Sequence, residues 1–534
     1  MKWTNQAVRT SGGLVSPISR RRLAVTAALI AIVALRLLLQ RELYRSGFEV
    51  IEGDEFLRTV KAAWWTRDPG LFLHRDQLIN WLPLPICLTG IALKIHWNIL
   101  FVPRGINVVL GAASLALMYF LARSLFDSPR AGLISALLLA VNPAHVWLSS
   151  TGLSEILYSA LLLAFLLCFT LHLQRNDPLS LVLASLFLAL ANATRYEGWA
   201  VSGVFSAFLV AGSARRTIRI RSFSARAAGE LAAAGLPWIF PAAWLIFNHH
   251  LTGKSVSFIS NITAGVALAD HLPTYGPYVQ AALTIDPWLA FLGIPAWIFV
   301  LFHRSAGRAA RGYAALLFLP MAAVVVLRGG GAMAWPTVYI RYLSTFFFLA
   351  YPALAWTLDW GTGCFFRNPA VRGGVLGAGL ILIVVAQAHR IFRFHDLHPP
   401  AGVKVGEMIA RIRASASCPD SGRFLIEDPG EEEPGAGWQI FAIMVGSGDA
   451  FSSGLIWHRE KTARFSLKQS NIAELNNYLK RREVRYIAVK SPALRGAAES
   501  RLGLKPEKDI GGYFFYPCPA SGDPSPAVIT ESRR

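Results

Sequence analysis

The chain has 534 residues, of which 54% are hydrophobic and 16% are charged, and its mean hydropathy is +0.42. A water-soluble globular protein of this size cannot hide so much apolar surface, so the composition excludes that class and indicates a membrane protein. The formal net charge of +20 does not indicate a nucleic-acid partner, because the Arg and Lys residues stand in short clusters between apolar windows and read as topology signals.

Apolar windows recur from residue 23 to residue 388, and each is long enough to cross about 30 Å of hydrocarbon as a helix. The basic clusters fall in alternate connections, which is typical of cytoplasmic loops and places the N-terminus in the cytoplasm. We therefore predict a polytopic α-helical membrane protein with about 11 transmembrane helices. The predicted spans are approximately residues 23–40, 105–121, 131–148, 155–173, 179–193, 198–213, 229–247, 286–302, 312–327, 342–358 and 373–388.

Composition divides the chain into three parts. Residues 1–22 are the predicted cytoplasmic N-terminal tail, and residues 23–390 the predicted transmembrane domain. The first window follows three arginines, as in a signal peptide, but no small-residue cleavage site comes after it, so we expect a retained anchor. Residues 400–534 are less hydrophobic and form the third part.

The region from 179 to 213 is predicted to form two helices. These 35 residues are mostly apolar but are interrupted by "ATRYEG", which contains Arg195 and Glu197. One long span would hold both charges in the middle of the bilayer, where each costs roughly 2.5 to 3.5 kcal/mol. Two short helices that meet near the outer surface avoid this cost.

A large outer segment, residues 41–104, follows the first span. It is too long for a simple turn, and "DEFLRTVKAAWW" and "LPLPICLTGIALKIHW" carry apolar or aromatic residues at helical spacing. We predict interfacial helices that lie on the bilayer surface.

Residues 400–534 show alternating strand and helix signals. "RFLIED", "VRYIAVK" and "YFFY" are typical of strands, and "IAELNNYLKRR" of an amphipathic helix. We predict a soluble α/β domain outside the membrane. Cys418 and Cys518 bracket it, and whether they form a disulfide bond is left open.

The acidic residues Asp54 and Glu55 stand where the chain leaves the first span. An ionised carboxylate at the bilayer surface can act as a general base towards an acceptor hydroxyl group. The alternative is purely structural, with Asp54 capping a solvated helix N-terminus.

Further polar residues are predicted at the same membrane face. "NPAHVWLSSTGLSE" contributes His145 and Glu155, and "PTVYIRYLS" contributes Arg341. The substrate-binding candidates collected there are His145, Glu155, Arg195, Tyr196, Glu197 and Arg341. Singly, such residues are more often interfacial than ligand-binding. Together they describe a base beside guanidinium groups that can hold a phosphate.

The order of these motifs resembles the GT-C superfamily of membrane glycosyltransferases. The motifs that show this resemblance are "GDE" after the first span, "PAHVWLSSTGLSE" after the third, "TRYEGW" at the helix break, and "RYLS" with "YPALA" at a late span. The chain is most similar to bacterial relatives of protein O-mannosyltransferase and of the lipid A aminoarabinose transferase, over roughly residues 20 to 390.

The resemblance implies transfer of a sugar from a polyprenyl-phosphate-linked donor to a hydroxyl acceptor outside the membrane, with inversion at the anomeric carbon. By this resemblance Asp54 matches the catalytic carboxylate of the first loop and Glu55 its neighbour. Arg195 and Arg341 match basic positions near the donor phosphate, and Glu155 a second acidic position near the site. The acceptor class, which is a lipid, a polysaccharide or a protein, stays open. A bacterial inner membrane, with the C-terminal domain in the periplasm, is the expected setting.

Other functions fit parts of the pattern. A transporter or flippase would also carry intramembrane charges, although it would place them at the midplane. An O-antigen ligase or polymerase would use a large late loop, whereas the large loop here comes first. A scaffold would present the C-terminal domain without needing the acidic pair. Oligosaccharyltransferase-like members of the superfamily hold a divalent ion with acidic residues, but Asp54 and Glu55 lack a DxD spacing. Metal dependence therefore stays open, with a metal-independent reaction favoured, and no cofactor is expected.

Overall fold

The structure is a computed structural model of the whole chain. The residues that it describes are 17–48, 54–70, 81–256, 283, 286–307, 309–314, 341, 344–393, 401–414, 423–427, 436–448, 455–458, 472–510 and 513–518. Most of the predicted span 312–327, the late loop before Arg341, and Cys418 lie outside them.

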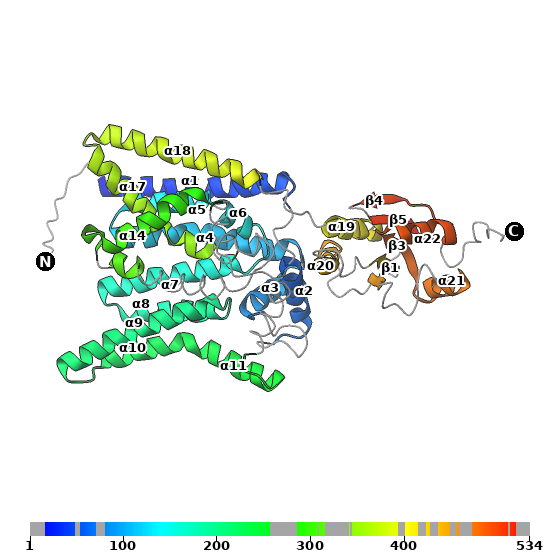
Figure 1. Cartoon of the computed structure of the whole chain (residues 1–534), viewed down its shortest axis with the longest axis horizontal. Coiled ribbons are helices and arrows are strands. Elements are labelled where there is room, and N and C mark those ends of the chain that lie inside the picture. Colours follow the sequence, from blue (N-terminus) through cyan, green and yellow to red (C-terminus); the bar gives the residue numbers. More distant parts are fainter. Residues whose placement is uncertain are drawn as a thin grey trace, which may run out of the picture.

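Helices dominate the N-terminal three quarters of the chain, and Figure 1 shows them side by side in one bundle. Among the described residues, five helices are long and apolar enough to cross a membrane, or six if a bent pair counts as one span. The number of about 11 spans therefore stays a prediction. The helices of the bundle are α1 (Pro17–Arg45), α4 (Phe101–Phe126), α5 (Pro129–Ala140), α6 (Pro143–Ser149), α7 (Glu155–Arg175), α8 (Pro178–Asn192), α9 (Glu197–Ile220), α10 (Ala225–Gly235), α11 (Ile239–Thr252), α14 (Ile294–Phe302), α17 (Tyr351–Phe365) and α18 (Pro369–Arg393).

The predicted span 131–148 is broken in the structure. The structure divides it into α5 and α6, which are bent by 64° at the break. The residue before a proline disfavours helical backbone, and Asn142 adopts an extended conformation before Pro143 and caps α6 by accepting a hydrogen bond from the His145 amide. After the bend, α6 packs against α4 and α18.

The predicted break between residues 179 and 213 is present, and α8 and α9 are separated by residues 193–196. Asn192 holds the junction, because its side-chain amide donates to the Pro237 carbonyl over 2.7 Å. A Cβ atom at Gly198 would lie 2.6 Å from Asn192 Oδ1. Only glycine therefore lets α9 begin so close to the end of α8.

An arginine inside the first span ties α1 to the bend. Arg36 is fully buried and donates hydrogen bonds to the carbonyl oxygens of Ala140, over 3.0 Å, and His145, over 2.5 Å. The Ala140 carbonyl stands at the C-terminal end of α5, where helical partners are missing. The membrane-embedded charge is thus solvated by protein.

The first outer segment contains the two predicted helices, α2 (Asp54–Arg67) and α3 (Leu84–Ile95). They pack on each other and share one apolar core with the C-terminal region, in which Phe56 and Val60 from α2 are buried together with Val403 and Ile443. Figure 1 shows α20 beside α2. The predicted position on the bilayer surface is not tested by these contacts.

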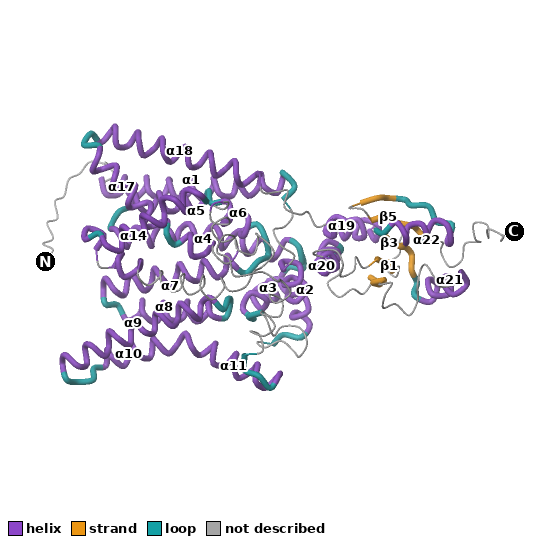
Figure 2. Tube along the Cα trace, in the orientation of Figure 1, coloured by secondary structure: helices purple, strands orange, loops and turns teal. Residues whose placement is uncertain are grey.

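The C-terminal region combines helices and strands, and the strands of Figure 2 are confined to it. Its sheet has five strands in the order β2-β1-β3-β5-β4. β1 lies parallel to β2 and β3, whereas β5 is antiparallel to β3 and β4. Its elements are α19 (Ala401–Ala414), β1 (Arg423–Glu427), α20 (Ala436–Gly446), β2 (Leu455–His458), α21 (Ile472–Arg481), β3 (Val484–Val489), α22 (Pro492–Leu502), β4 (Lys508–Ile510) and β5 (Tyr513–Pro517).

The strands and the helix that the sequence predicted here are all present. That this region is soluble and lies outside the membrane stays a prediction, as do the three domain boundaries. Cys518 is a free thiol and Cys418 lies outside the described residues, so a bridge between them is not observed.

Candidate active site

Three carboxylates stand at the N-termini of helices. Asp54 begins α2, Glu155 begins α7 and Glu197 begins α9. The N-terminal turn of a helix carries partial positive charge and unpaired amide groups, so it stabilises an acidic side chain. These helix ends lie close enough for the three carboxylates to share arginine partners.

The shared partners make an unbroken chain of ion pairs. Arg341 Nη1 lies 2.8 Å from Asp54 Oδ2, and Arg341 Nε lies 2.5 Å from Glu155 Oε1. The same Glu155 Oε1 atom lies 2.6 Å from Arg195 Nη1. Arg195 then holds Glu197 through two hydrogen bonds of 2.8 and 3.2 Å. Of the sequence-predicted residues, these five lie together.

Asp54 is the most accessible carboxylate of this chain of ion pairs. Its side chain is 19% exposed, whereas those of Glu155 and Glu197 are 0% and 7% exposed. Buried ion pairs orient their members but leave little room for a ligand. Asp54 is therefore the member that an incoming hydroxyl group can reach.

Glu55 points away from this chain of ion pairs and fixes the position of α2. Its Oε1 lies 2.7 Å from Arg104 Nε on α4 and accepts a hydrogen bond of 2.9 Å from the Gly152 amide. Its side chain is only 2% exposed. The geometry favours a structural function for Glu55.

Two basic residues of α2 were not among the predicted site residues. Arg58 and Lys61 follow Asp54 by one and two helical turns, so they lie on the same helix face. Both contact the ring of Trp81, with the Arg58 guanidinium carbon 4.4 Å and Lys61 Nζ 4.7 Å from its centroid. The sequence contained one signal for these two residues: they follow Asp54 by four and seven positions, a spacing that places them on the same face of a helix.

Burial changes the proton affinity of these bases. Desolvation lowers the pKa of Arg58, although Glu155 and Asp54 oppose the shift. Burial, followed by the charge of Arg58, lowers the pKa of Lys61 to about 8. The buried Nε atom of Arg58 has no hydrogen-bond partner among the described residues. This face of α2 thus presents positive charge that an anion would stabilise.

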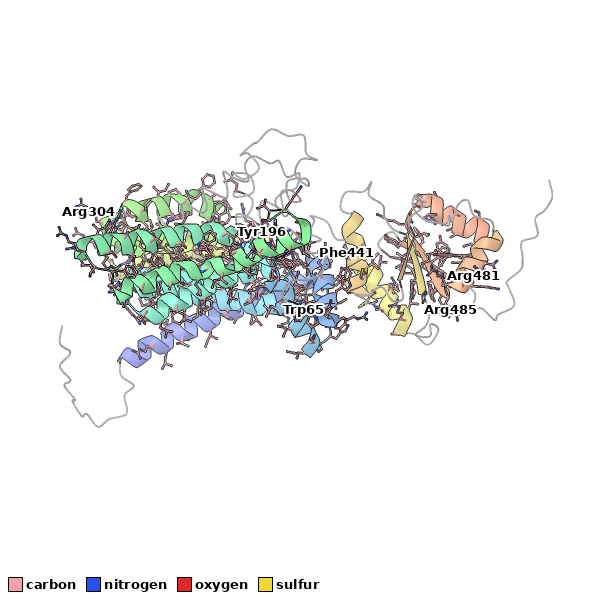
Figure 3. All side chains as sticks on the ribbon, turned by 90° about the horizontal axis from the view of Figure 1, so that it is seen from below. Trp65, Tyr196, Arg304, Phe441, Arg481 and Arg485 are labelled. Carbon is pink, nitrogen blue, oxygen red and sulfur yellow. The ribbon has the colours of Figure 1, made fainter. Side chains whose placement is uncertain are left out.

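His145 and Tyr196 are not members of the chain of ion pairs. His145 is fully buried in the bundle with its ring edge-on to Phe348. The Tyr196 hydroxyl accepts a hydrogen bond from the Trp244 indole over 3.2 Å, and its ring packs against Trp199. Figure 3 shows Tyr196 and Trp65 at the end of the bundle near the C-terminal region, and Arg304 at the opposite end.

The acidic residues do not form a metal cluster within the part of the chain that the structure describes. No group of three or more His, Cys, Asp or Glu side chains there is arranged to hold an ion. Each of Asp54, Glu155 and Glu197 is instead paired with an arginine. A cation would have to displace these arginines.

Comparison with known sequences gives one family match. Residues 82–260, about a third of the chain, match the family described as dolichyl-phosphate-mannose-protein mannosyltransferase. This stretch includes Glu155, Arg195 and Glu197 but neither Asp54 nor Arg341. A search of curated proteins gave no significant match.

Comparison with solved structures extends the likeness to most of the chain. ArnT from Cupriavidus metallidurans bound to undecaprenyl phosphate has a TM-score of 0.58 at 12% identity, over 92% of this chain and 98% of that one. The same protein in its apo state has a TM-score of 0.54 at 11% identity, over the same 92% and 98%. The apo oligosaccharyltransferase of Archaeoglobus fulgidus has a TM-score of 0.51 at 13% identity, over 87% of this chain and 69% of that one.

The chain has the fold of the GT-C membrane glycosyltransferases. The resemblance inferred from the sequence motifs is thereby confirmed. In this chain the first outer segment, the α6–α7 junction, the α8–α9 break and Arg341 converge on one cluster of charges. The catalytic and binding roles of the individual residues stay predictions.

Proposed function

We propose that the protein transfers a sugar from a polyprenyl-phosphate donor to a hydroxyl acceptor at the outer face of the membrane, with inversion. The observation that carries this proposal is the accessible carboxylate of Asp54, held beside the basic residues Arg58, Lys61 and Arg341. Sugar transfer needs both a base for the acceptor and positive charge for the departing phosphate.

Asp54 is the proposed general base. Arg341 Nη1 donates to its Oδ2 atom, and we assign its other carboxylate oxygen, Oδ1, to the acceptor. The acceptor O–H gives its proton to Asp54 while its oxygen forms a bond to the anomeric carbon. The bond between that carbon and the phosphate oxygen breaks on the opposite side. A single displacement of this kind inverts the anomeric carbon.

The leaving group is polyprenyl phosphate, which departs with the bonding electrons. A phosphate needs no general acid to leave, but its growing negative charge must be stabilised. Arg58 and Lys61 lie one and two turns from Asp54 on the same face of α2, and Trp81 holds both cations in place. We assign these two residues to the donor phosphate, with Arg341 between phosphate and base.

The donor class is supported by the ArnT structure, which contains undecaprenyl phosphate and covers 92% of this chain. The acceptor is a hydroxyl group of a lipid, a polysaccharide or a protein. The proposed setting is a bacterial inner membrane, with the site and the C-terminal region in the periplasm. The proposed mechanism uses no cofactor or metal.

The test is transfer of radiolabelled sugar from a panel of polyprenyl-phosphate sugars to cell-envelope extracts. The purified wild type is compared with Arg58→Gln and with Arg45→Gln as the matched control, since Arg45 is an exposed arginine at the end of α1. We expect transfer by the wild type and by Arg45→Gln, and a loss of roughly a hundredfold or more in Arg58→Gln.

Equal transfer by both variants would remove Arg58 from the donor site. Absence of transfer by the wild type with every donor of the panel, while the protein remains folded, would contradict the proposed reaction.

A further inference from the structure

A groove runs along the outside of the bundle at the end opposite to the active site. Its volume is about 1080 Å³, and one wall is a stripe of α1. The opposite wall belongs to α4, with Pro129 of α5 at one end. The lining residues are Arg22, Val25, Thr26, Leu29, Ile30, Val33, Ala116, Tyr119, Phe120, Arg123, Asp127 and Pro129.

The lining is apolar along its length and basic at one end. The residues between Val25 and Val33 on α1 are mostly aliphatic, and Phe120 and Tyr119 face them from α4. Ile30 is 64% exposed, which in a membrane means exposure to lipid. An apolar groove open to the bilayer can hold an acyl chain without exposing it to water.

Two arginines stand at the basic end. Arg22 begins the apolar part of α1, and Arg123 lies in the last turn of α4. Neither forms an ion pair with another described residue, although Asp127 also lies at this rim. The sequence places both arginines on the side of the arginine-rich loops, which is the cytoplasmic side. Arg22 and Arg123 together with Asp127 give this end of the groove a net positive charge, which would attract an anionic headgroup.

The length of the groove matches one leaflet. From Arg22 to Val33 the helix rises roughly 16 Å, which is about half of the hydrocarbon thickness. We propose that this groove binds one anionic phospholipid of the cytoplasmic leaflet, with its phosphate at Arg22 and Arg123 and an acyl chain along Val25 to Val33. Basic pockets between membrane helices on the cytoplasmic side favour anionic headgroups.

The groove is separate from the proposed donor site. Arg104, which pairs with Glu55 near the active site, and Arg123 are both on α4. They are 19 positions apart, which corresponds to roughly 28 Å along the helix. A lipid held in the groove therefore has its headgroup at the opposite membrane surface from Asp54.

The test uses full-length protein in phosphatidylcholine bilayers that contain a trace of photoactivatable phosphatidylglycerol or, in parallel, photoactivatable phosphatidylcholine, each with the reactive group on an acyl chain. Mass spectrometry measures labelling of peptides that contain residues 22–33 and 116–123. We expect phosphatidylglycerol to label both stretches more strongly than phosphatidylcholine. The double variant Arg22→Gln, Arg123→Gln should reduce this excess about fivefold for each lost arginine.

Arg175→Gln is the matched control, because Arg175 is an exposed arginine at the end of α7 and does not line the groove; it should keep the excess. Ile30→Trp narrows the groove without changing its charge and should reduce labelling of both stretches. Equal labelling by the two lipids in the wild type, or an unchanged excess in the double variant, would overturn the proposal.

Discussion

Arg341 Nη1 lies 2.8 Å from Asp54 Oδ2, although the two residues are 287 positions apart in the chain. The same guanidinium group holds Glu155 through Nε. Arg341 can therefore orient the proposed base and couple the first outer segment to α7.

Arg341→Lys should lower the rate of transfer because lysine keeps the charge but cannot bridge two carboxylates in a fixed geometry. We expect kcat to fall about tenfold to a hundredfold, with a smaller change in KM for the donor. Steady-state kinetics measure both. Arg372→Lys is the control, since Arg372 pairs with Asp359 and should leave both constants near wild type. A wild-type kcat in Arg341→Lys would show that this bridge does not position the base.

Glu155→Gln should destabilise the protein strongly. Glu155 is fully buried between Arg195 and Arg341, and loss of one member of a buried ionic network leaves the other charges uncompensated, at a cost of about 3 to 5 kcal/mol. Thermal unfolding in detergent should show a clear fall in Tm. Glu230→Gln makes the same chemical change next to Arg216 and Arg226, whose side chains are 32% and 48% exposed. Water can solvate these partners, so the fall should be smaller there. Equal falls in Tm would contradict the importance assigned to Glu155.

Lys61 should make donor binding depend on pH. Its pKa is lowered to about 8, so the charge offered to the phosphate is lost as the pH rises through about 8, and donor affinity should fall. The free energy of unfolding should change in the opposite direction to the donor affinity. Between pH values of about 8 and 10.5, the ordinary pKa of lysine, the unfolded chain binds a proton at Lys61 and the folded chain does not. The folded state therefore becomes more stable as the pH rises across this window.

Donor titrations and thermal unfolding at several pH values measure the two trends. Lys61→Arg keeps its charge in this range, so the decrease in donor affinity should disappear in that variant. A decrease of the same size in wild type and variant would assign it to another group.

The sequence alone gave reliable predictions where a local pattern has one structural solution. Three signals predicted helices and strands that the structure contains. They are the apolar windows, the charged interruption at Arg195 and Glu197, and the alternating strand and helix patterns after residue 400. The bend at Asn142 was missed because hydropathy continues across it, and only the following Pro143 marks it.

The candidate site could be predicted in part. Three carboxylates at helix N-termini and two arginines were found from their motifs. Their pairing was not predictable, because it joins segments as far apart as Asp54 and Arg341. The sequence pattern around Arg58 and Lys61 predicts only an amphipathic helix. Their assignment to the donor phosphate depends on their contacts with Trp81, which the structure shows.

The contact between α2 and α20 should support activity. Gly446, at the end of α20, lies against the backbone of Val403 on α19, and a Cβ atom there would collide with the Val403 carbonyl oxygen. Gly446→Ala should therefore displace α20, which shares a core with α2, and reduce transfer although Asp54 is unchanged. Gly496→Ala on α22 meets no atom within 4 Å and is the control. Unchanged transfer in Gly446→Ala, with limited proteolysis showing a displaced C-terminal region, would separate that region from catalysis.

The central claim is that Asp54 is the base and Glu55 is structural. The most direct measurement is the single-turnover rate of sugar transfer from a bound polyprenyl-phosphate sugar, for wild type, Asp54→Asn and Glu55→Gln. Our account predicts a loss of about a hundredfold to ten-thousandfold in Asp54→Asn, with donor binding retained. Glu55→Gln should lose stability through Arg104 but keep most of its rate per folded molecule. A wild-type rate in Asp54→Asn, or a larger loss of rate in Glu55→Gln, would contradict it.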